Sequence, residues 1–339
     1  MADGTHIQWA EASVNPIRAR DRETGKRGWF CTRVSDACKN CYASDKNANR
    51  FYGTGHEYTV ANLAKVELYL EPKVLQEVIG WQRPRTIFWC SMTDLFGEFV
   101  PDAWIDQVLA AIALSPQHRH IILTKRIARA SEYLSREGRN EHISREIIDL
   151  YCQKGAPTPS VARGFEARKA NATARGLAPV NDWPRPNVII GASVENQEWA
   201  DKRRPAMERI AALGWPTWVS NEPALGDIDW SGWEFLSWMV SGGESGARAK
   251  IRECRLEWIR QSRDWCRANG VPWFNKQLGG SPTVRAEENP RLWPDKLDWG
   301  VEATPTSTRW CVRLRDRKGG TWDEWPEDLR VREMPRWAS

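Results

Sequence analysis

The sequence predicts an α/β fold, built as a partial or complete parallel (β/α) barrel. Two features of the sequence predict it. Short apolar segments rich in β-branched and aromatic residues recur along the chain, and helical segments separate several of them. These apolar segments also lack the alternation of apolar and polar residues that a half-exposed strand shows. A chain of 339 residues is long enough for one such barrel with insertions.

Six segments are expected to be buried parallel strands, because each is apolar on both faces. They lie at residues 86–92, 120–125, 187–194, 216–223, 237–244 and 271–277. Helices are expected from about Ala43 and at residues 101–115, 195–214 and 255–270, where Gly270 stands at a C-cap position. Repeated strand and helix favours crossover connections, as in a barrel or a doubly wound sheet.

An insertion is expected at about residues 135–186, since this stretch is far longer than one crossover needs. Its second half is rich in Gly, Pro and Ala, and we expect a partly helical segment around residues 160–175. Residues 154–186 carry six basic and two acidic side chains, which suits contact with phosphates. A solvated surface excursion is the alternative. The candidate nucleic-acid-binding residues are Arg163, Arg168, Lys169 and Arg175.

The domain organisation expected is a barrel of residues 1–280 and a cap of residues 281–339. The cap segment is rich in Trp among mixed charges, so we expect it to pack on the barrel in an irregular or β-rich form. A single large domain with an appended cap accounts for the whole length.

Composition indicates a soluble globular protein, with 41% hydrophobic and 27% charged residues. The N-terminal segment lacks a basic region followed by an apolar one, and no run of about 18 apolar residues occurs. We therefore expect a cytoplasmic protein without a membrane partner, in the host cytoplasm if a phage encodes it. The net charge of +5 permits a polyanionic partner without predicting one.

Three of the eight cysteines form the motif Cys31-x6-Cys38-x2-Cys41. Thiolates at this spacing can reach one metal centre. A structural zinc ion would need a fourth ligand, for which His56 is the nearby candidate. A four-iron cluster needs no fourth protein ligand if its remaining iron binds a small molecule, and this interpretation is favoured. Unrelated thiols are the third possibility, although clustered exposed thiols oxidise readily.

Further motifs surround this cysteine loop, and together they resemble the radical S-adenosylmethionine superfamily. The resemblance is nearer still to a phage- and prophage-associated family of radical-SAM-like proteins whose function was long unassigned. It covers the chain from Trp9 to about Gly280. The segments that carry it are WAEASVNP (9–16), the cysteine motif followed by Tyr42, SMTDLF (91–96), LTKR (123–126), GASVEN (191–196), SNEP (220–223), GGESG (242–246) and WFNKQLGG (273–280).

The sequence departs from the superfamily pattern in two places. Six residues separate Cys31 from Cys38, where most members have three. In the superfamily a Gly-Gly-Glu-like segment follows the second strand, whereas here Gly242, Gly243 and Glu244 follow a late one. The geometry of the cluster loop and the role of these glycines therefore cannot be transferred.

The resemblance implies a 4Fe-4S cluster held by Cys31, Cys38 and Cys41, S-adenosylmethionine as cofactor, and a reductase or flavodoxin-type electron donor. Asp94 suits the ammonium group of that cofactor, and Lys125 or Arg126 suits its carboxylate. Each polar residue could equally be a loop cap or part of a salt bridge. The cofactor-binding candidates are Tyr42, Ser91, Asp94, Lys125, Ser193 and Glu195. The catalytic candidates are Glu222, Glu244 and Lys276.

The function expected from the resemblance is generation of a 5′-deoxyadenosyl radical that abstracts hydrogen from an unactivated carbon. The substrate expected is a nucleobase in phage DNA, with isomerisation of a glycine substituent on hypermodified thymidine from nitrogen to carbon linkage as the concrete candidate. Two alternatives stay open: a zinc-stabilised nucleic-acid-binding protein without catalysis, and a radical enzyme that acts on a protein or a small molecule.

Overall fold

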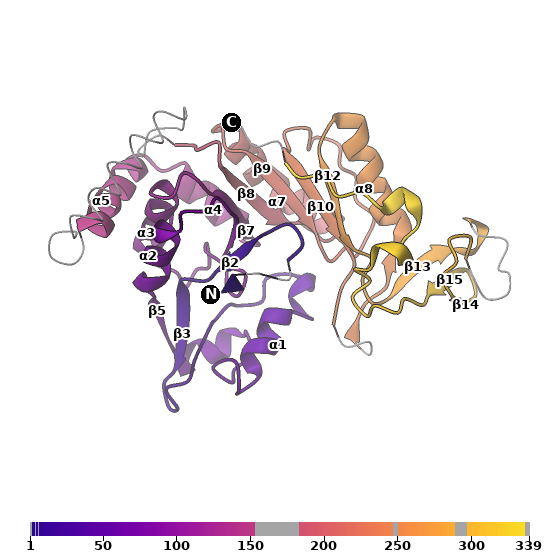
Figure 1. Ribbon diagram of the computed structural model, residues 1–339, viewed down its shortest axis with the longest axis horizontal. Helices are drawn as coiled ribbons and strands as arrows, with labels where there is room; N and C mark the ends of the chain where they lie inside the picture. The colour runs from indigo at the N-terminus through magenta and orange to yellow at the C-terminus, as the bar shows by residue number, and fades with distance from the viewer. Residues whose placement is uncertain are drawn as a thin grey trace.

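A curled, mainly parallel sheet forms the centre of the molecule in the computed structural model, which describes residues 2, 3, 5, 7–152, 183–246, 250–288 and 297–335 (Figure 1). Its strands lie in the order β1-β2-β6-β7-β8-β9-β10-β12, in which β1 is antiparallel to β2 and the other neighbours are parallel. Their bounds are β1 (Ala2–Asp3), β2 (Ala12–Val14), β6 (Thr86–Trp89), β7 (Arg119–Thr124), β8 (Val188–Ser193), β9 (Thr217–Asn221), β10 (Trp238–Gly242) and β12 (Trp273–Gln277). The six strands predicted from sequence are confirmed.

The order of the parallel strands in space is their order in the chain. A doubly wound sheet reverses its strand order at a switch point, and this sheet does not. Successive crossovers in one direction curl the sheet into a half-barrel, whose last strands β2 and β12 are not paired with each other. The partial-barrel prediction is thus confirmed at the level of architecture.

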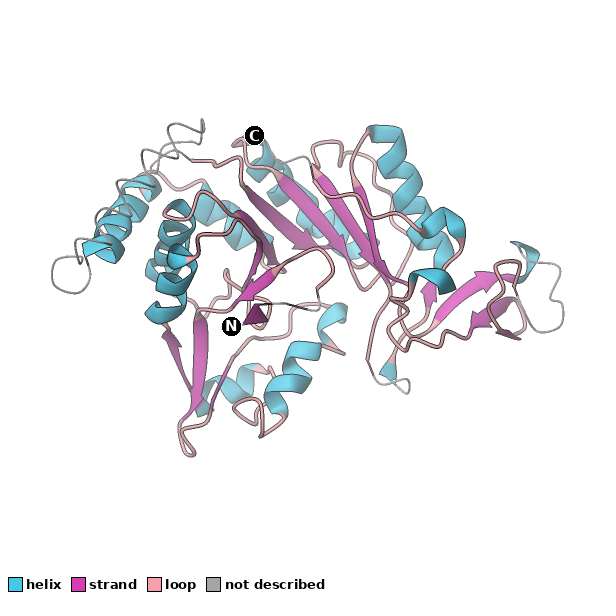
Figure 2. Cartoon of the chain, in the orientation of Figure 1, coloured by secondary structure: helices cyan, strands magenta, loops and turns pink. Residues whose placement is uncertain are grey.

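Helices cover the convex face of the half-barrel (Figure 2). Alternate strand residues such as Ile87, Ile122 and Met239 pack against these helices in the main hydrophobic core. In α8, Gly270 adopts a left-handed conformation (φ 66°) and donates its N–H to the Cys266 carbonyl, so the expected C-cap is confirmed. The helices are α2 (Pro72–Gly80), α3 (Asp102–Ala113), α4 (Ile127–Leu134), α5 (Arg139–Cys152), α7 (Gln197–Ala212) and α8 (Leu256–Asn269).

The concave face is filled at the amino ends of the strands by a second apolar cluster, to which the helices contribute nothing. Its centre is Trp218, which stacks on Trp238 with ring centroids 4.9 Å apart and donates its indole N–H to the Ile122 carbonyl at 3.0 Å. Gly191 makes room for this indole, because a Cβ there would lie 2.2 Å from Nε1. The concave face is therefore filled by apolar side chains at the amino ends of the strands. The polar side chains lie at the carboxyl ends.

The segment between β2 and β6 forms a small structure of its own that the sequence prediction missed. Three strands pair antiparallel in the order β4-β3-β5, with β3 (Ile17–Asp21), β4 (Arg27–Gly28) and β5 (Val66–Leu70). Between β4 and β5 lie η1 (Asp36–Cys38), α1 (Tyr42–Ala48) and η2 (Val60–Lys65). The expected helix near Ala43 exists, and it lies apart from the helices that cover the sheet (Figure 1).

The C-terminal cap is β-rich, as expected, and forms a four-stranded sheet in the order β11-β13-β15-β14. One strand of it, β11 (Cys254–Arg255), comes from the segment assigned to the barrel. The others are β13 (Pro282–Arg285), β14 (Ala303–Pro305) and β15 (Arg309–Val312), with short helices η4 (Ala286–Glu288), η5 (Trp322–Glu324) and η6 (Glu327–Leu329). Residues after η6 then pair with the free edge of β12.

The expected insertion is partly regular structure, since α5 occupies its first part and buries Ile143, Ile147 and Leu150 in the main core. The helical segment expected around residues 160–175 lies outside the described residues, as do Arg163, Arg168, Lys169 and Arg175. Among the residues that are described, no helix combines the length and apolar character needed to cross a membrane.

Candidate functional site

The loop that carries Cys31, Cys38 and Cys41 runs between β4 and α1. All three cysteines are free thiols and half-buried. Cys38 ends η1 and Cys41 immediately precedes α1, while Cys31 and Cys41 pack against a small apolar cluster that includes Met92. The motif is therefore held between two short helices and the end of β6.

Arg126 anchors one side of the cysteine loop to the strand ends. Its buried guanidinium follows β7 and donates to Asp94 Oδ2 at 3.1 Å and to Glu98 Oε2 at 2.6 Å. The same group donates to the carbonyl and hydroxyl oxygens of Thr32 and lies 3.8 Å from Cys31 Sγ. A single rigid, fork-shaped cation thus joins the first cysteine to two strand-end loops.

Glu244 anchors the opposite side of the loop. Its carboxylate accepts a hydrogen bond from Asn40 Nδ2 at 2.9 Å and is paired with Arg252, which also donates to the Asp36 carbonyl at 2.9 Å. Burial opposes ionisation of Glu244, but the hydrogen bonds from Arg252 and Asn40 hold its pKa below the usual value. The cysteine loop is therefore attached both after β6 and β7 and after β10, and it lies over the carboxyl ends of the half-barrel strands.

The thiols lie close enough to affect one another and two cations. Burial raises the pKa of the Cys31 thiol to about 12; Asp94 adds to the rise and Arg126 opposes it. Burial also raises the pKa of Cys41, where the Ser44 N–H and the Lys125 ammonium act in the opposite direction. Arginine and lysine near the sulfurs are the surroundings in which thiolates and anionic metal–thiolate groups are stabilised.

Below the cysteine loop, two polar pairs lie on the concave side of the strand ends. Glu222 accepts hydrogen bonds from Lys276 Nζ at 2.7 and 2.9 Å, and Lys125 Nζ donates to Ser193 Oγ at 3.0 Å. Lys276 stands two residues after Phe274, which belongs to the concave cluster, so the two side chains share a face. The same alternation places Lys125, Ser193 and Glu222 above the apolar floor.

Tyr42 connects the cysteine loop with these pairs. Its hydroxyl donates to the Ser91 carbonyl at 2.7 Å, and burial together with Cys41 and Glu222 raises its pKa. Yet 57% of the Tyr42 side chain is open to solvent. The Tyr42 hydroxyl is thus influenced by the Cys41 thiol and the Glu222 carboxylate, while much of the residue is exposed.

Two predicted carboxylates are taken up by internal contacts. Asp94 accepts from Thr124 Oγ1 at 2.6 Å and from the Lys125 N–H at 3.0 Å besides Arg126, so both of its oxygens are engaged. Glu195 is fully buried and pairs with Arg203 at 2.6 Å. Burial opposes ionisation of Glu195, but Arg203 and Lys125 lower its pKa. Internal contacts thus engage both oxygens of Asp94 and Oε2 of Glu195, and Ser91 is likewise bonded to Ser13 and Asn15.

The three cysteine thiols and His56 are the predicted candidate metal ligands of this loop. Among the described residues, no group of three or more His, Cys, Asp and Glu side chains could hold a metal ion as it stands. In a four-iron cluster each thiolate binds its own iron, so the ligands surround a volume instead of meeting at one point. His56, the fourth ligand that zinc would require, has its Nε2 in contact with Asp21 at 2.5 Å.

Sequence reasoning missed the residues that anchor the loop. Asn40 and Arg252 carry no local signal, because Asn40 bonds to Glu244 and Arg252 to the Asp36 carbonyl, both distant in the chain. Asn40 and Glu244, for example, are 204 residues apart. Arg126 was recognisable as one of two cations after β7, but only the structure assigns it to Cys31, Asp94 and Glu98 while its neighbour Lys125 faces Ser193.

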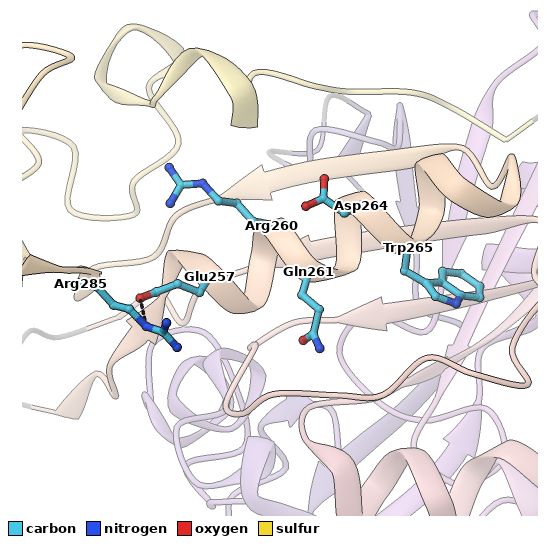
Figure 3. A pocket seen from close by; sticks show the side chains of 6 residues that line it. All are labelled: Glu257, Arg260, Gln261, Asp264, Trp265 and Arg285. Carbon is cyan, nitrogen blue, oxygen red and sulfur yellow. Dashed lines mark ion pairs between the residues drawn. The ribbon is translucent and has the colours of Figure 1, made fainter. Parts of the chain in front are cut away.

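An open hollow of about 520 Å³ lies away from this site, on the outer side of α8 (Figure 3). Glu257 and Arg285 pair across it at 3.3 Å. It contains none of the predicted site residues, and we assign it no function. Its lining residues are Glu257, Arg260, Gln261, Asp264, Trp265 and Arg285.

Comparison with known proteins places the chain in a family. A sequence profile described as a protein of unknown function, DUF5131, matches residues 4–326. The chain belongs to this family. The DUF5131 match includes the cysteine loop, all the strands from β2 to β12 and most of the cap, so the site described above lies wholly within it. Searches of curated proteins and of solved structures gave no match.

Proposed function

We propose that the protein is a radical S-adenosylmethionine enzyme whose 4Fe-4S cluster is held by Cys31, Cys38 and Cys41. The observation that carries this proposal is the position of the cysteine loop. It lies over the carboxyl ends of a singly wound parallel half-barrel, where the ligands of such folds bind. The finer assignment of the half-barrel to the radical SAM type belongs to the same proposal.

The polar pairs suit the two ends of an amino-acid ligand. Glu222 offers a carboxylate for an ammonium group, and Lys125 offers an ammonium for a carboxylate. Asp94 accepts hydrogen bonds from four groups and its side chain is 7% exposed, whereas the side chain of Glu222 accepts from Lys276 and Gln277 and is 15% exposed. The ammonium partner therefore passes in this proposal from Asp94 to Glu222. Lys276 orients Glu222 through two hydrogen bonds, and Tyr42 lies near both Glu222 and Cys41.

The chain's own residues would also control the surroundings of the reaction. When bound, the cluster would supply the electron for cleavage of S-adenosylmethionine. The apolar floor formed by Trp218, Trp238 and Phe274 excludes water from the base of the half-barrel, which limits side reactions of a radical. Arg126 lies close enough to Cys31 to balance negative charge there.

The substrate proposed is a nucleobase in DNA, with rearrangement of a glycine substituent on hypermodified thymidine as the concrete candidate. The residues chosen for contact with nucleic acid, Arg163, Arg168, Lys169 and Arg175, lie outside the described residues, so this part rests on sequence alone. Nucleoside mass spectrometry of glycyl-substituted DNA after incubation with reconstituted enzyme tests it. Unchanged DNA beside cleaved S-adenosylmethionine would remove this substrate and keep the enzyme class.

The enzyme class is tested by anaerobic purification, iron and sulfide analysis, and electron paramagnetic resonance of the reduced protein with and without S-adenosylmethionine. We expect a cluster signal that S-adenosylmethionine changes and that Cys38→Ala abolishes. Cys311→Ala is the matched control, because Cys311 is also a half-buried free thiol but lies in β15 of the cap. Stoichiometric zinc without iron would overturn the proposal and favour a zinc-stabilised binding protein.

A further inference from the structure

Large hydrophobic side chains that remain exposed are gathered on the segment that follows the cysteine motif. Five of the seven such side chains in the described part of the chain lie between Tyr42 and Leu63. Single exposed apolar residues are common on protein surfaces, but a concentration of them marks a binding surface. The five are Tyr42, Phe51, Tyr52, Val60 and Leu63.

Phe51 is the extreme case, with 94% of its surface exposed, and its neighbour Tyr52 is 65% exposed. They stand on the turn at residues 49–53 that follows α1, which we name the aromatic turn. Neither residue belongs to a hydrophobic core cluster of the described residues. Burial of their rings therefore contributes nothing to folding, and their exposure calls for a different explanation.

The aromatic turn is nevertheless firmly held. Asn49 Oδ1 accepts the Phe51 N–H at 3.0 Å, and the Tyr52 N–H donates to the Asn49 carbonyl at 3.0 Å. Behind the turn, the fully buried Asn47 bonds to Trp29, Thr54 and His56. Gly53 packs directly on Asn47, since a Cβ there would lie 2.4 Å from the Asn47 carbonyl oxygen. Two aromatic rings are thus presented to solvent on a preformed support, which lowers the entropy lost on binding.

Two basic residues stand near the rings in the chain. Lys46 in α1 and Arg50 in the aromatic turn are exposed and have no ion-pair partner within the described part of the chain. The nearby acidic residue Glu57 is already paired with Arg33 at 3.1 Å. A second copy of this chain docked symmetrically would bring these cations toward their own equivalents, which is unfavourable. A partner must therefore combine negative charge with flat apolar faces.

We infer that the aromatic turn, together with Lys46 and Arg50, is a binding site for single-stranded nucleic acid, in which bases stack on Phe51 and Tyr52. Aromatic rings beside cations are the common means by which proteins bind unpaired bases, and duplexes conceal the base faces that this surface would use. The inference deepens the proposed function, because α1 begins at the residue after Cys41 and so joins this surface to the cysteine loop.

Fluorescence anisotropy tests the inference on the full chain. The probes are a labelled oligothymidylate longer than the ~16 nucleotides that one site spans, and the duplex of the same oligonucleotide. We expect the single strand to bind more tightly than the duplex. The double variant Phe51→Ala, Tyr52→Ala should weaken single-strand binding at least about tenfold. Lys46→Glu with Arg50→Glu should weaken it as well and lower the slope of log K against log salt by about 2.

Two controls separate this surface from general effects. Leu213→Ala removes an exposed large hydrophobic elsewhere, and Lys73→Glu with Arg83→Glu reverses two exposed charges near α2. The inference would be overturned if the Phe51→Ala, Tyr52→Ala variant kept its affinity for the single strand or lost no more of it than Leu213→Ala does. Equal affinity of the parent chain for duplex and single strand would also overturn it. Retained DNA affinity beside lost reduction by flavodoxin would overturn it too and assign the surface to a protein partner. A chain that binds single strands but contains no iron would remove the cluster proposal alone, so failure of that proposal is distinguishable from failure here.

Discussion

Lys276 Nζ lies 2.7 and 2.9 Å from the two carboxylate oxygens of Glu222, and this ion pair stands at the carboxyl ends of β9 and β12, above an apolar floor. The two side chains are only partly exposed. A carboxylate so oriented retains an accepting face for a second cation, because each oxygen has more than one lone-pair direction.

Glu222→Gln should weaken binding of S-adenosylmethionine about 10- to 100-fold, since a hydrogen bond to a charged group contributes about 1.5–3 kcal/mol. Isothermal titration calorimetry under anaerobic conditions measures the effect. Glu57→Gln is the control, because Glu57 belongs to an exposed pair with Arg33 and should leave the affinity unchanged. Equal affinities for all three proteins would remove Glu222 from the binding site.

Glu244→Gln should loosen the cysteine loop while the half-barrel persists. Loss of charge at a buried, multiply bonded carboxylate lowers the free energy of unfolding by about 1–3 kcal/mol, measurable by chemical denaturation. Trypsin should then cleave faster after the exposed Lys39, which precedes the anchoring Asn40.

Glu253→Gln serves as the comparison, because Glu253 pairs with Arg255 and Arg309 next to the C-terminal sheet. It should reduce stability without accelerating cleavage at Lys39. Faster cleavage in both variants would show that Glu244 has no special hold on the loop.

His120 should make stability fall in mild acid. The side chain is fully buried; its Nδ1 accepts the Trp89 indole N–H at 3.0 Å, and Nε2 lies 3.1 Å from the Ser115 carbonyl. Burial lowers its pKa to about 3, with His118 adding to the effect. Below the unfolded value of about 6.5, the unfolded chain binds a proton that the folded one excludes, so stability decreases by up to about 1.4 kcal/mol per pH unit.

Denaturation at several pH values between about 5 and 6.5 checks this prediction. His120→Gln should flatten the dependence of the unfolding free energy on pH, whatever its effect on absolute stability. His142→Gln, which alters an exposed histidine, should keep the slope of the parent chain. The same slope in all three proteins would contradict the assignment.

Gly191→Ala should destabilise the fold by at least about 1–3 kcal/mol, because the new methyl group collides with the buried Trp218 indole. Thermal or chemical denaturation measures it. Trp218→Phe in the same chain should recover part of the loss. Gly80→Ala is the control: it ends α2 with no atom within 4 Å of its added Cβ, and it should be neutral. A neutral Gly191→Ala would mean that Trp218 can move.

The sequence predicted the half-barrel because its inner strands are apolar on both faces, a signal independent of distant contacts. It missed β2 and β3 for the same reason. β2 has only three residues, and β3 reads IRARD, in which arginines occupy every second position. Strands that are short or polar on one face have little signal of their own, and their pairing is decided by what folds against them.

The candidate site was predictable in place but not in detail. Asp94, Glu195, Glu222 and Glu244 all follow strands, so the sequence could gather them at one edge. Which of them is engaged by an internal cation depends on how the loops approach one another. Arg252, eight residues beyond Glu244, donates to its carboxylate, and no sequence periodicity predicts such a contact.

The segment after η6 has a consequence for the way the chain avoids aggregation. The Asn275 N–H donates to the Val331 carbonyl, and the Glu333 N–H donates to the Trp273 carbonyl, each at 2.9 Å. Without this segment, the unpaired N–H and C=O groups of β12 could pair with a strand of another molecule. Pairing of this kind between edge strands leads to aggregation. Residues 331–333 are synthesised after β12. The edge of β12 therefore stays unpaired in the nascent chain until these residues have been made. By covering the edge of β12, the C-terminal segment protects the sheet of its own chain from pairing with other chains.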